Sequence, residues 1–264
     1  MNLGLQGKIA VVSGSTAGIG LSIATALAAE GARVIINGRT EARVTEAIEK
    51  IRQRVSSADL RGVAADLGTA AGVDAFLRKA PDADVLVNNL GIFDPKPFLE
   101  IPDQEWLRFF EVNVLSGVRL TRKYLPAMLK KNWGRVIFIS SESAQNIPAE
   151  MVHYGMTKTA QVAIARGLAQ SVAGTGVTVN SVLAGPTESE GVGTFLDSLA
   201  KQQNISKAEV EKLFFEKARP TSLLKRFETP DEVAAVVAFV ASTQALVING
   251  AAVRAEGGVI QSIF

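Results

Sequence analysis

Residues 8–20 are Lys8-Ile9-Ala10-Val11-Val12-Ser13-Gly14-Ser15-Thr16-Ala17-Gly18-Ile19-Gly20. The apolar run at its start is typical of a strand buried on both faces, and the alanine- and leucine-rich residues 21–30 predict a helix. Glycines between them permit a tight turn and close backbone approach, while the helix N-terminus offers free N–H groups. The segment therefore predicts a strand–turn–helix unit that can cradle a phosphate. Taken alone, a tight turn that binds nothing is the alternative.

The same alternation of strand and helix continues along the chain. Apolar runs predict strands at 33–37, 60–65, 84–88, 134–140, 177–183 and about 247–253. Helices are predicted at 41–55, about 71–79, 104–130 and 153–172, and from Pro230, which suits a first helical turn. Strands joined through helices pair in parallel. We therefore predict an α/β fold: a doubly wound, Rossmann-like parallel sheet of about seven strands with helices on both faces, as one domain over 1–264.

One stretch, at about 188–226, departs from this alternation. It carries apolar clusters within polar sequence, namely Phe195-Leu196, Leu199, Leu213-Phe214-Phe215 and Leu223-Leu224. Loops of this length in a compact domain are usually functional lids or flexible segments. We expect a lid-like insert whose apolar side chains favour a fairly hydrophobic small-molecule ligand.

Composition excludes several classes of site. The 264 residues include no cysteine and one histidine, so thiolate nucleophiles, iron–sulfur clusters and multi-histidine metal sites are excluded, and no metal is expected. The 28 basic and 26 acidic residues nearly balance, which gives no reason to expect a nucleic acid or an anionic membrane as partner. No targeting segment or membrane-length apolar run is evident, so a cytoplasmic protein is expected.

Further motifs follow the glycine turn in a fixed order. They are Asn88-Asn89-Leu90-Gly91, Asn113 in Glu111-Val112-Asn113-Val114, Ser141 thirteen residues before Tyr154, Tyr154-Gly155-Met156-Thr157-Lys158, the segment Asn180 to Thr187, Asn249-Gly250 and Gly257-Gly258. With the glycine spacing Ser-Gly-x-x-x-Gly-x-Gly, this set resembles the short-chain dehydrogenase/reductase family over nearly the whole chain. The sequence departs from that pattern at Leu90, where alanine is usual, and at Ala184, where proline is usual.

Tyr154 and Lys158 are four residues apart on a predicted helix, so their Cβ atoms lie about 5–6 Å apart on one face. A nearby ammonium favours a phenolate, so we expect a lowered tyrosine pKa and proton transfer near neutral pH. A helix-surface pair without chemistry is the alternative for these two residues alone.

The resemblance implies hydride transfer between a nicotinamide cofactor and a carbonyl/alcohol pair, with four catalytic residues. Ser141 would hydrogen-bond the substrate oxygen, Tyr154 would be the general acid or base, and Lys158 would lower the tyrosine pKa and hold the nicotinamide ribose. Asn113 would hold a water that links Lys158 to solvent. His153 adjoins Tyr154 but points about 100° away around the helix, so we expect it to take no part.

The resemblance also implies a set of cofactor-binding positions: Gly14, Ser15, Thr16, Gly18, Ile19, Gly20, Arg39, Thr40, Asp66, Leu67, Asn89, Gly91, Tyr154, Lys158, Pro186 and Thr187. Turns that favour NAD usually place an acid after the second strand, yet residues 37–40 contain no carboxylate. Arg39 can instead pair with a 2′-phosphate. We therefore expect NADP, with NAD as the alternative.

Other functions remain open at this stage. A 3-oxoacyl-(acyl-carrier-protein) reductase would take a carrier-linked substrate, with Lys130, Lys131 and Arg135 as candidate contacts to an acidic carrier. A non-catalytic dinucleotide-binding sensor and a methyltransferase are alternatives of other classes. The expected partner is a small-molecule carbonyl or alcohol substrate. The resemblance implies a homotetramer or dimer packed through the helices near 104–130 and 153–172.

Overall fold

Seven parallel strands form one sheet in the computed structural model, which describes residues 2–188, 192–193, 196–197, 200–201 and 204–263. Their order across the sheet is β3-β2-β1-β4-β5-β6-β7, so the winding direction reverses between β1 and β4. The strands are β1 (Ile9–Val12), β2 (Arg33–Gly38), β3 (Leu60–Ala64), β4 (Val85–Asn88), β5 (Gly134–Ser141), β6 (Val177–Ala184) and β7 (Ala252–Ala255). The predicted doubly wound α/β fold is confirmed.

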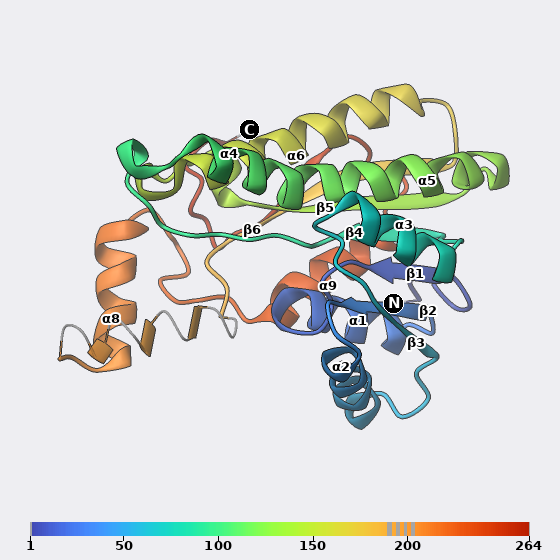
Figure 1. The fold of residues 1–264 in the computed structure, drawn as a ribbon, viewed down its shortest axis with the longest axis horizontal. Helices are drawn as coiled ribbons and strands as arrows, with labels where there is room; N and C mark the ends of the chain where they lie inside the picture. Colours follow the sequence, from blue (N-terminus) through green and yellow to red (C-terminus); the bar gives the residue numbers. More distant parts are fainter. Residues whose placement is uncertain (1, 189–191, 194–195, 198–199, 202–203, 264) are drawn as a thin grey trace.

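Helices cover both faces of the sheet (Figure 1). One face carries α1 (Gly18–Ala29), α2 (Glu41–Arg54) and α9 (Pro230–Ala241). The other face carries α3 (Ala70–Lys79), α5 (Ser116–Lys131) and α6 (Val152–Ser171), with α4 (Asp103–Phe110) packed against α6. The helix α8 (Lys207–Leu213) lies to one side, beyond the carboxyl ends of the strands (Figure 1). The short helical turns are η1 (Phe98–Glu100), η2 (Glu111–Leu115), η3 (Glu142–Ala144), η4 (Ala149–Met151) and η5 (Phe214–Ala218).

Two apolar cores follow from the twofold alternation of side chains along each strand. In β1, Val12 packs toward α1 and α9, whereas its neighbour Val11 packs toward α3 and α5. Both valines are fully buried, because helices cover both faces. This double burial explains why the strands are continuous apolar runs.

Two elements differ from the sequence prediction. The helix expected at 104–130 is divided into α4 and α5 by the π-helical turn η2, which contains Asn113. The strand expected at about 247–253 begins only at Ala252. Gly250 adopts a positive φ of 70°, and the Asn249 side chain accepts a hydrogen bond from the backbone of Val179, so these residues form a turn instead.

None of the helices that the structure describes is both long enough and apolar enough to cross a membrane.

The start of α9 carries a capping box that can be tested. Thr229 Oγ1 accepts a hydrogen bond from the Glu232 N–H (3.3 Å), and the Glu232 carboxylate accepts one from the Thr229 N–H (2.8 Å). Replacing Thr229 with alanine removes the side-chain acceptor of the Glu232 N–H, so we expect the free energy of unfolding to fall by about 1 kcal/mol. Urea denaturation measures this loss. Thr229→Ser keeps the hydroxyl and should lose much less; an equal loss in both variants would contradict the capping role.

Candidate active site

Four loops meet where β1, β4, β5 and β6 end, because the carboxyl ends of parallel strands share one edge of the sheet. A cavity of about 580 Å³ opens there. Its lining includes Ile19, Asn89, Gly91, Ser141, Tyr154, Lys158, Pro186 and Thr187 of the predicted site. The edge lies beside the reversal point between β1 and β4, where ligands bind in doubly wound sheets.

The glycine turn adopts backbone conformations that other residues disfavour. Gly14 has φ 61° and Gly18 has φ 53°. A Cβ atom on Gly20 would collide with the carbonyl oxygen of Gly14 and with the Asn89 side chain. Helix α1 begins at Gly18, and Ala17 at its N-cap provides no side-chain hydrogen bond. The first turn of α1 therefore has N–H groups without a side-chain cap, as an anion-binding helix terminus requires.

Buried polar side chains hold this turn in place, and sequence reasoning missed this role for two of them. Asn37 Oδ1 accepts from the Gly14 N–H (3.1 Å), while its Nδ2 donates to the backbone of Val63 and Ala65. The Ser13 hydroxyl accepts from the N–H of Asn89 (2.9 Å). Asparagine and serine inside apolar strands are an available signal, because a buried polar group must find a partner.

Asn89 and the neighbouring Leu90 complete that support. Asn89 Nδ2 donates to the carbonyls of Ser13 and Gly14, each at 3.0 Å. Leu90 packs against the core beneath the turn and against Gly14, where an added Cβ would lie 3.3 Å from the Leu90 Cα. The core thus accommodates leucine at position 90, where alanine is usual.

Four further residues of the predicted cofactor site lie at the ends of β2 and β3. Arg39 and Thr40 are exposed, and an added Cβ on the adjacent Gly38 would contact Thr16 of the glycine turn. Thr40 also caps α2 by accepting from the Arg43 N–H (3.4 Å). Asp66 is exposed and accepts from the Gly68 N–H (3.0 Å), whereas Leu67 is a fully buried core residue. The Leu67 side chain is therefore turned away from solvent, and only the Leu67 backbone could meet a ligand.

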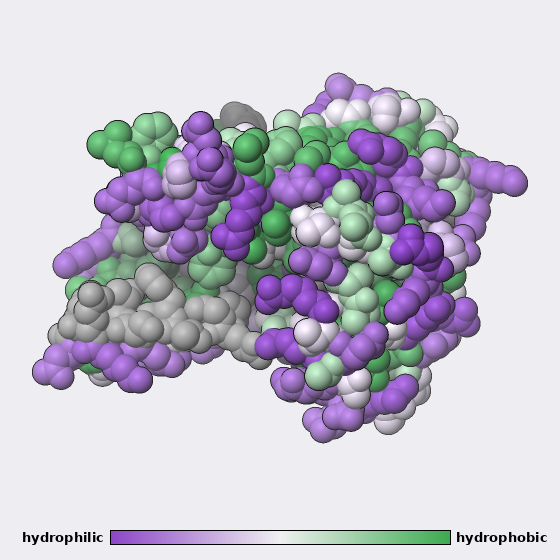
Figure 2. Space-filling view, viewed as in Figure 1, coloured by the Kyte–Doolittle hydropathy of each residue, from purple (hydrophilic) through white to green (hydrophobic). Residues whose placement is uncertain are grey.

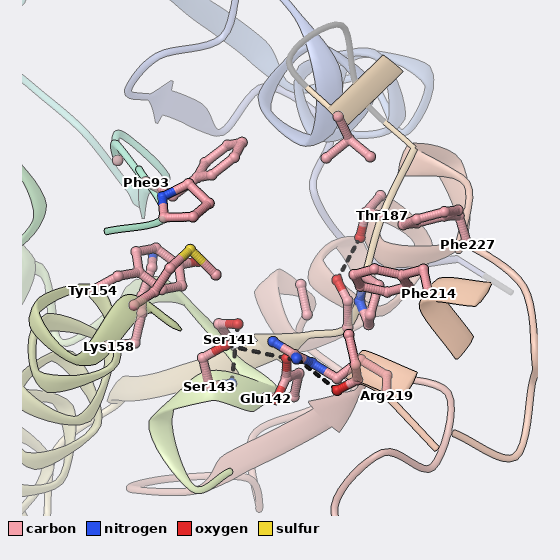
Figure 3. Close-up of a pocket in the computed structure, with 18 of the residues that line it drawn as sticks. Phe93, Ser141, Glu142, Ser143, Tyr154, Lys158, Thr187, Phe214, Arg219 and Phe227 are labelled. Atoms are coloured by element: carbon pink, nitrogen blue, oxygen red, sulfur yellow. Dashed lines mark hydrogen bonds and ion pairs between the residues drawn. The ribbon is translucent and has the colours of Figure 1, made fainter. Parts of the chain in front are cut away.

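Ser141, Tyr154 and Lys158 come together in the cavity from two elements (Figure 3). Ser141 ends β5, and its Oγ accepts from the Ser143 N–H (3.1 Å). Tyr154 and Lys158 lie one turn apart on α6, with the Lys158 Nζ 5.5 Å from the centre of the tyrosine ring. Phe93 packs edge-on against that ring at 6.4 Å. The predicted serine, tyrosine and lysine thus share one wall.

Burial controls the protonation of both α6 residues. It raises the pKa of Tyr154 to about 12, which the hydrogen bond with Ser141 only partly opposes. It lowers the pKa of Lys158 to about 8, since desolvation disfavours the ammonium. The expected lowering of the tyrosine pKa is therefore wrong for the protein alone, because burial of the phenol itself has the largest effect.

Asn113 lies within the π-helical turn η2, with its side chain directed at the backbone after β4. Its Oδ1 accepts from the Ile92 N–H (2.8 Å), and its Nδ2 donates to the Ile92 carbonyl (3.0 Å) and to Thr157 Oγ1 (3.0 Å). Asn113 is not among the residues that line the cavity. It fixes the segment after β4 against α6.

His153 is fully buried between aromatic rings, away from the cavity lining. Its ring centre lies 4.0 Å from that of Phe109 and 5.9 Å from that of Trp106. Burial lowers the pKa of His153, which keeps the imidazole neutral at neutral pH. This placement agrees with its expected absence from the chemistry.

A buried ion pair forms one side of the cavity (Figure 3). Arg219 Nε lies 2.8 Å from Glu142 Oε1, and both side chains are less than one-tenth exposed. Arg219 also pairs with the half-exposed Glu150 at 3.4 Å. Burial nevertheless raises the pKa of Glu142, even though Arg219 opposes the change. Sequence reasoning missed this pair, because residues 77 positions apart carry no local pattern.

Apolar side chains form another part of the cavity wall, and several belong to the predicted insert at 188–226. Val192, Leu196, Val210, Phe214 and Phe227 all line it. Phe214 and Phe227 stack with ring centres 5.1 Å apart. Two further residues of the predicted apolar clusters, Phe195 and Leu199, lie outside the described residues.

Thr187 closes the site beyond β6, where it is buried rather than solvated. Its hydroxyl donates to the Gly185 carbonyl (2.9 Å), and Glu228 Oε2 accepts from the Gly185 N–H (3.3 Å). Burial raises the pKa of Glu228 to about 7. Glu228, which sequence reasoning did not identify, therefore supports the turn that carries Pro186 and Thr187.

The family model of the short chain dehydrogenases matches residues 8–199. The chain belongs to the short-chain dehydrogenase/reductase family. The family and the enzyme class predicted from the sequence are both confirmed, and relatives carry the names of oxidoreductases and dehydrogenases.

Two relatives and one solved structure illustrate the likeness. The chain is 51% identical to "Uncharacterized oxidoreductase YvaG" of Bacillus subtilis, with both chains fully covered. It is 34% identical to the D-beta-hydroxybutyrate dehydrogenase of Cupriavidus necator, covering 96% of this chain and 98% of that one. The crystal structure of L-sorbose reductase from Gluconobacter frateurii, complexed with NADPH and L-sorbose, superposes with a TM-score of 0.94 at 29% identity over the full length of both chains.

The buried ion pair of this short-chain dehydrogenase/reductase can be tested through stability. Arg219→Met leaves the Glu142 carboxylate buried without its partner, so we expect a loss of about 3–5 kcal/mol in the free energy of unfolding at pH 8. Without Arg219 the folded-state pKa of Glu142 rises further above 4.5, its ordinary value. Relative to the parent, the variant should therefore be most stable at low pH and lose stability as the pH rises through that folded-state pKa.

Urea denaturation at pH 5, 6 and 8 measures this dependence. The double variant Glu142→Gln, Arg219→Met removes the unpaired charge and should recover most of the loss at pH 8. A single variant whose stability relative to the parent does not change with pH would contradict a buried, charged pair.

Proposed function

We propose that the protein transfers a hydride between NADP(H) and a carbonyl/alcohol pair on a small, fairly apolar substrate. The observation that carries this proposal is the convergence of Ser141, Tyr154 and Lys158 on one cavity beside the glycine turn. Membership of the short-chain dehydrogenase/reductase family supports the reaction class.

The residues around the turn fit a dinucleotide. Gly14 and Gly18 have positive φ, and the first turn of α1 has no side-chain cap, which suits a diphosphate. A Cβ on Gly91 would lie 3.5 Å from the Lys158 Nζ, so a side chain there would enter the space beside the ammonium. Asn89 and Thr187 line the same cavity from the ends of β4 and β6. Together these positions would hold the dinucleotide, which supplies the hydride when bound.

The proton chemistry follows from the protonation states. With a pKa near 12, Tyr154 carries its proton at neutral pH and can donate it to a carbonyl oxygen. Ser141 can donate a second hydrogen bond to that oxygen and stabilise its developing charge. In the direction of alcohol oxidation Tyr154 must first lose its proton, and the ammonium of Lys158 then stabilises the phenolate.

The cavity supports a substrate with one polar and one apolar end. Ser141 and Tyr154 would meet the reacting oxygen, while Phe214, Phe227 and Leu196 offer an apolar wall. Arg219 is paired with Glu142 and Glu150, so a substrate carboxylate would have to compete with both for the guanidinium. We therefore favour an uncharged carbonyl compound.

NADP is favoured over NAD by the surroundings of Arg39. This side chain is exposed beside the glycine turn, and residues 37–40 contain no acid to repel a 2′-phosphate. The L-sorbose reductase with its bound NADPH lends support as a structural neighbour. Thr40 can add a hydroxyl, although its side chain also caps α2.

The acyl-carrier alternative is weakened by where the structure places two of the basic residues that were expected to contact the carrier. Arg135 is 2% exposed and donates to the carbonyls of Gly134, Gly176 and Ser242, so it cannot meet a carrier. Lys131 pairs with Asp84 at 2.9 Å. Arg135 also lies at the start of β5, about 20 Å from Ser141 at its end, since a strand rises about 3.3 Å per residue.

A non-catalytic sensor would need the dinucleotide site but not the reacting groups. Serine, tyrosine and lysine all line the cavity here, so the enzyme is the better hypothesis.

We also propose a homotetramer or dimer packed through α4, α5 and α6. Leu107 on α4 is 70% exposed. Apolar side chains also gather near η1, the turn before α4, where Leu99 is 95% exposed (Figure 2).

Tyr154→Phe tests the acid–base role. Loss of the hydroxyl should lower kcat/KM for carbonyl reduction by about 100-fold or more, while the Kd for NADPH stays within about twofold. A panel of uncharged ketones and aldehydes with NADPH supplies the assay. Tyr124→Phe is the matched control, since it removes the other tyrosine hydroxyl of the chain, which bonds the Ala80 carbonyl at 2.6 Å outside the cavity. Parental turnover in Tyr154→Phe would reject the mechanism.

Arg39→Ala tests the cofactor preference. The parent should use NADPH more efficiently than NADH, and the variant should lose about 10- to 100-fold in kcat/KM with NADPH alone, as expected for a hydrogen bond to a charged group. Kinetics with both cofactors measure the difference. Arg61→Ala removes another exposed arginine and should change neither cofactor. A parent that prefers NADH, or equal losses with both cofactors, would count against NADP.

A further inference from the structure

Lys158 has two described hydrogen-bond partners at the base of the cavity. Its Nζ donates to the backbone carbonyl of Ile139 on β5 (2.9 Å) and to the side-chain oxygen of Gln161 (3.3 Å). An ammonium has three N–H donors, so one remains for a bound group. The two contacts therefore decide where the third donor points.

Gln161 is a buried amide on the same helix, one turn after Lys158, and only 1% exposed. Its Nε2 donates to the backbone carbonyl of Asn113 at 2.6 Å. The family resemblance led us to expect a water between Lys158 and Asn113. In this chain an amide side chain connects the two.

The orientation of this amide is determined by its partners. Lys158 offers only donors and the Asn113 carbonyl only an acceptor, so Oε1 must face the ammonium and Nε2 the carbonyl. A flipped amide would place N–H against N–H and oxygen against oxygen. The bridge thus has one arrangement, anchored in η2 at one end and reaching Lys158 on α6 at the other.

We propose that Gln161 is a positioning residue that holds the Lys158 ammonium at the cavity and ties it to the backbone of Asn113. The inference rests on the proposed role of Lys158 beside the dinucleotide and adds a residue that the catalytic motifs do not contain. An amide neither gains nor loses a proton near neutral pH. Gln161 therefore orients the ammonium without taking its proton.

The charges around Lys158 are consistent with a neutral support. Burial alone accounts for its lowered pKa of about 8. On the elements packed against α6, most of the described charged side chains have other partners: Glu142 and Glu150 with Arg219, Glu105 with Lys96, Glu111 with Arg119, and Arg135 with backbone carbonyls. The other two, Asp103 and Arg108, lie on α4, and neither is a partner of Lys158. A glutamate at 161 would be the first carboxylate in contact with this ammonium.

The experiment titrates Lys158 directly, in protein without any dinucleotide. Lysine labelled with ¹³C at Cε reports the protonation of each lysine by NMR, and Lys158→Arg identifies the signal. In the parent we expect a midpoint near pH 8. In Gln161→Glu it should rise by about one unit or more, because an opposite charge now contacts the ammonium. In Gln161→Leu it should fall, because a hydrogen bond to the charged form is lost.

Gln170→Leu is the matched control, since it removes an exposed glutamine from the same helix and should leave the midpoint unchanged. The parent provides a measurement that needs no folded variant. The ¹⁵N–¹H signals of the Gln161 amide should shift with the same midpoint as Lys158. A Lys158 midpoint that is the same in parent, Gln161→Glu and Gln161→Leu would overturn the proposal, as would a Gln161 amide that does not respond.

Because these measurements use no cofactor, they separate this inference from the proposed function. A chain that binds neither NADPH nor NADH would refute the function, while the titration still decides the role of Gln161. If both hold, Gln161→Leu should also weaken NADPH binding, with Gln170→Leu again unchanged.

Discussion

The burial of one positive charge constrains the whole site. Lys158 lies at the base of a cavity with apolar side chains on much of its wall, where desolvation penalises its ammonium. A charge in such a place needs polar partners, and this chain supplies neutral ones: the carbonyl at the end of β5 and the amide of Gln161. The sheet, α6 and the π-helical turn η2 must all be in register for these dipoles to converge. The support of a single ammonium thus connects three elements distant in sequence.

The fold was largely predictable because the central strands β1, β4, β5 and β6 are buried on both faces and several helices have recognisable ends. The pattern at 8–30 contains the whole strand–turn–helix unit, and Pro230 marks the start of α9 correctly. The prediction failed where tertiary contacts override local pattern. Residues 247–250 lie in a loop, because Asn180 and Asn249 bind the backbone of this loop and that of the adjacent strand. The π-helical turn around Asn113 has no local signal that distinguishes it from the helices on either side.

The residues of the candidate site also fall into a group that the sequence predicted and a group that it did not. The resemblance to the family singled out Ser141, Tyr154 and Lys158, and helical spacing by itself placed only Tyr154 and Lys158 on one face of a helix. Asn37, Gln161, Glu142 and Arg219 were not assigned roles, because their partners lie on other elements. The protonation of Tyr154 could not be foreseen either. Spacing predicts proximity to an ammonium, but not that burial acts more strongly on both groups.

The Glu142–Arg219 pair has a consequence for exchanging parts between relatives. Glu142 adjoins Ser141 at the end of β5, whereas Arg219 belongs to the segment that bears the apolar cavity wall. Residues of that segment are natural choices for transplanting a different substrate preference. A donor segment without the arginine would leave an unpaired acid beside Ser141. Chimeras that involve this chain should therefore exchange positions 142 and 219 together.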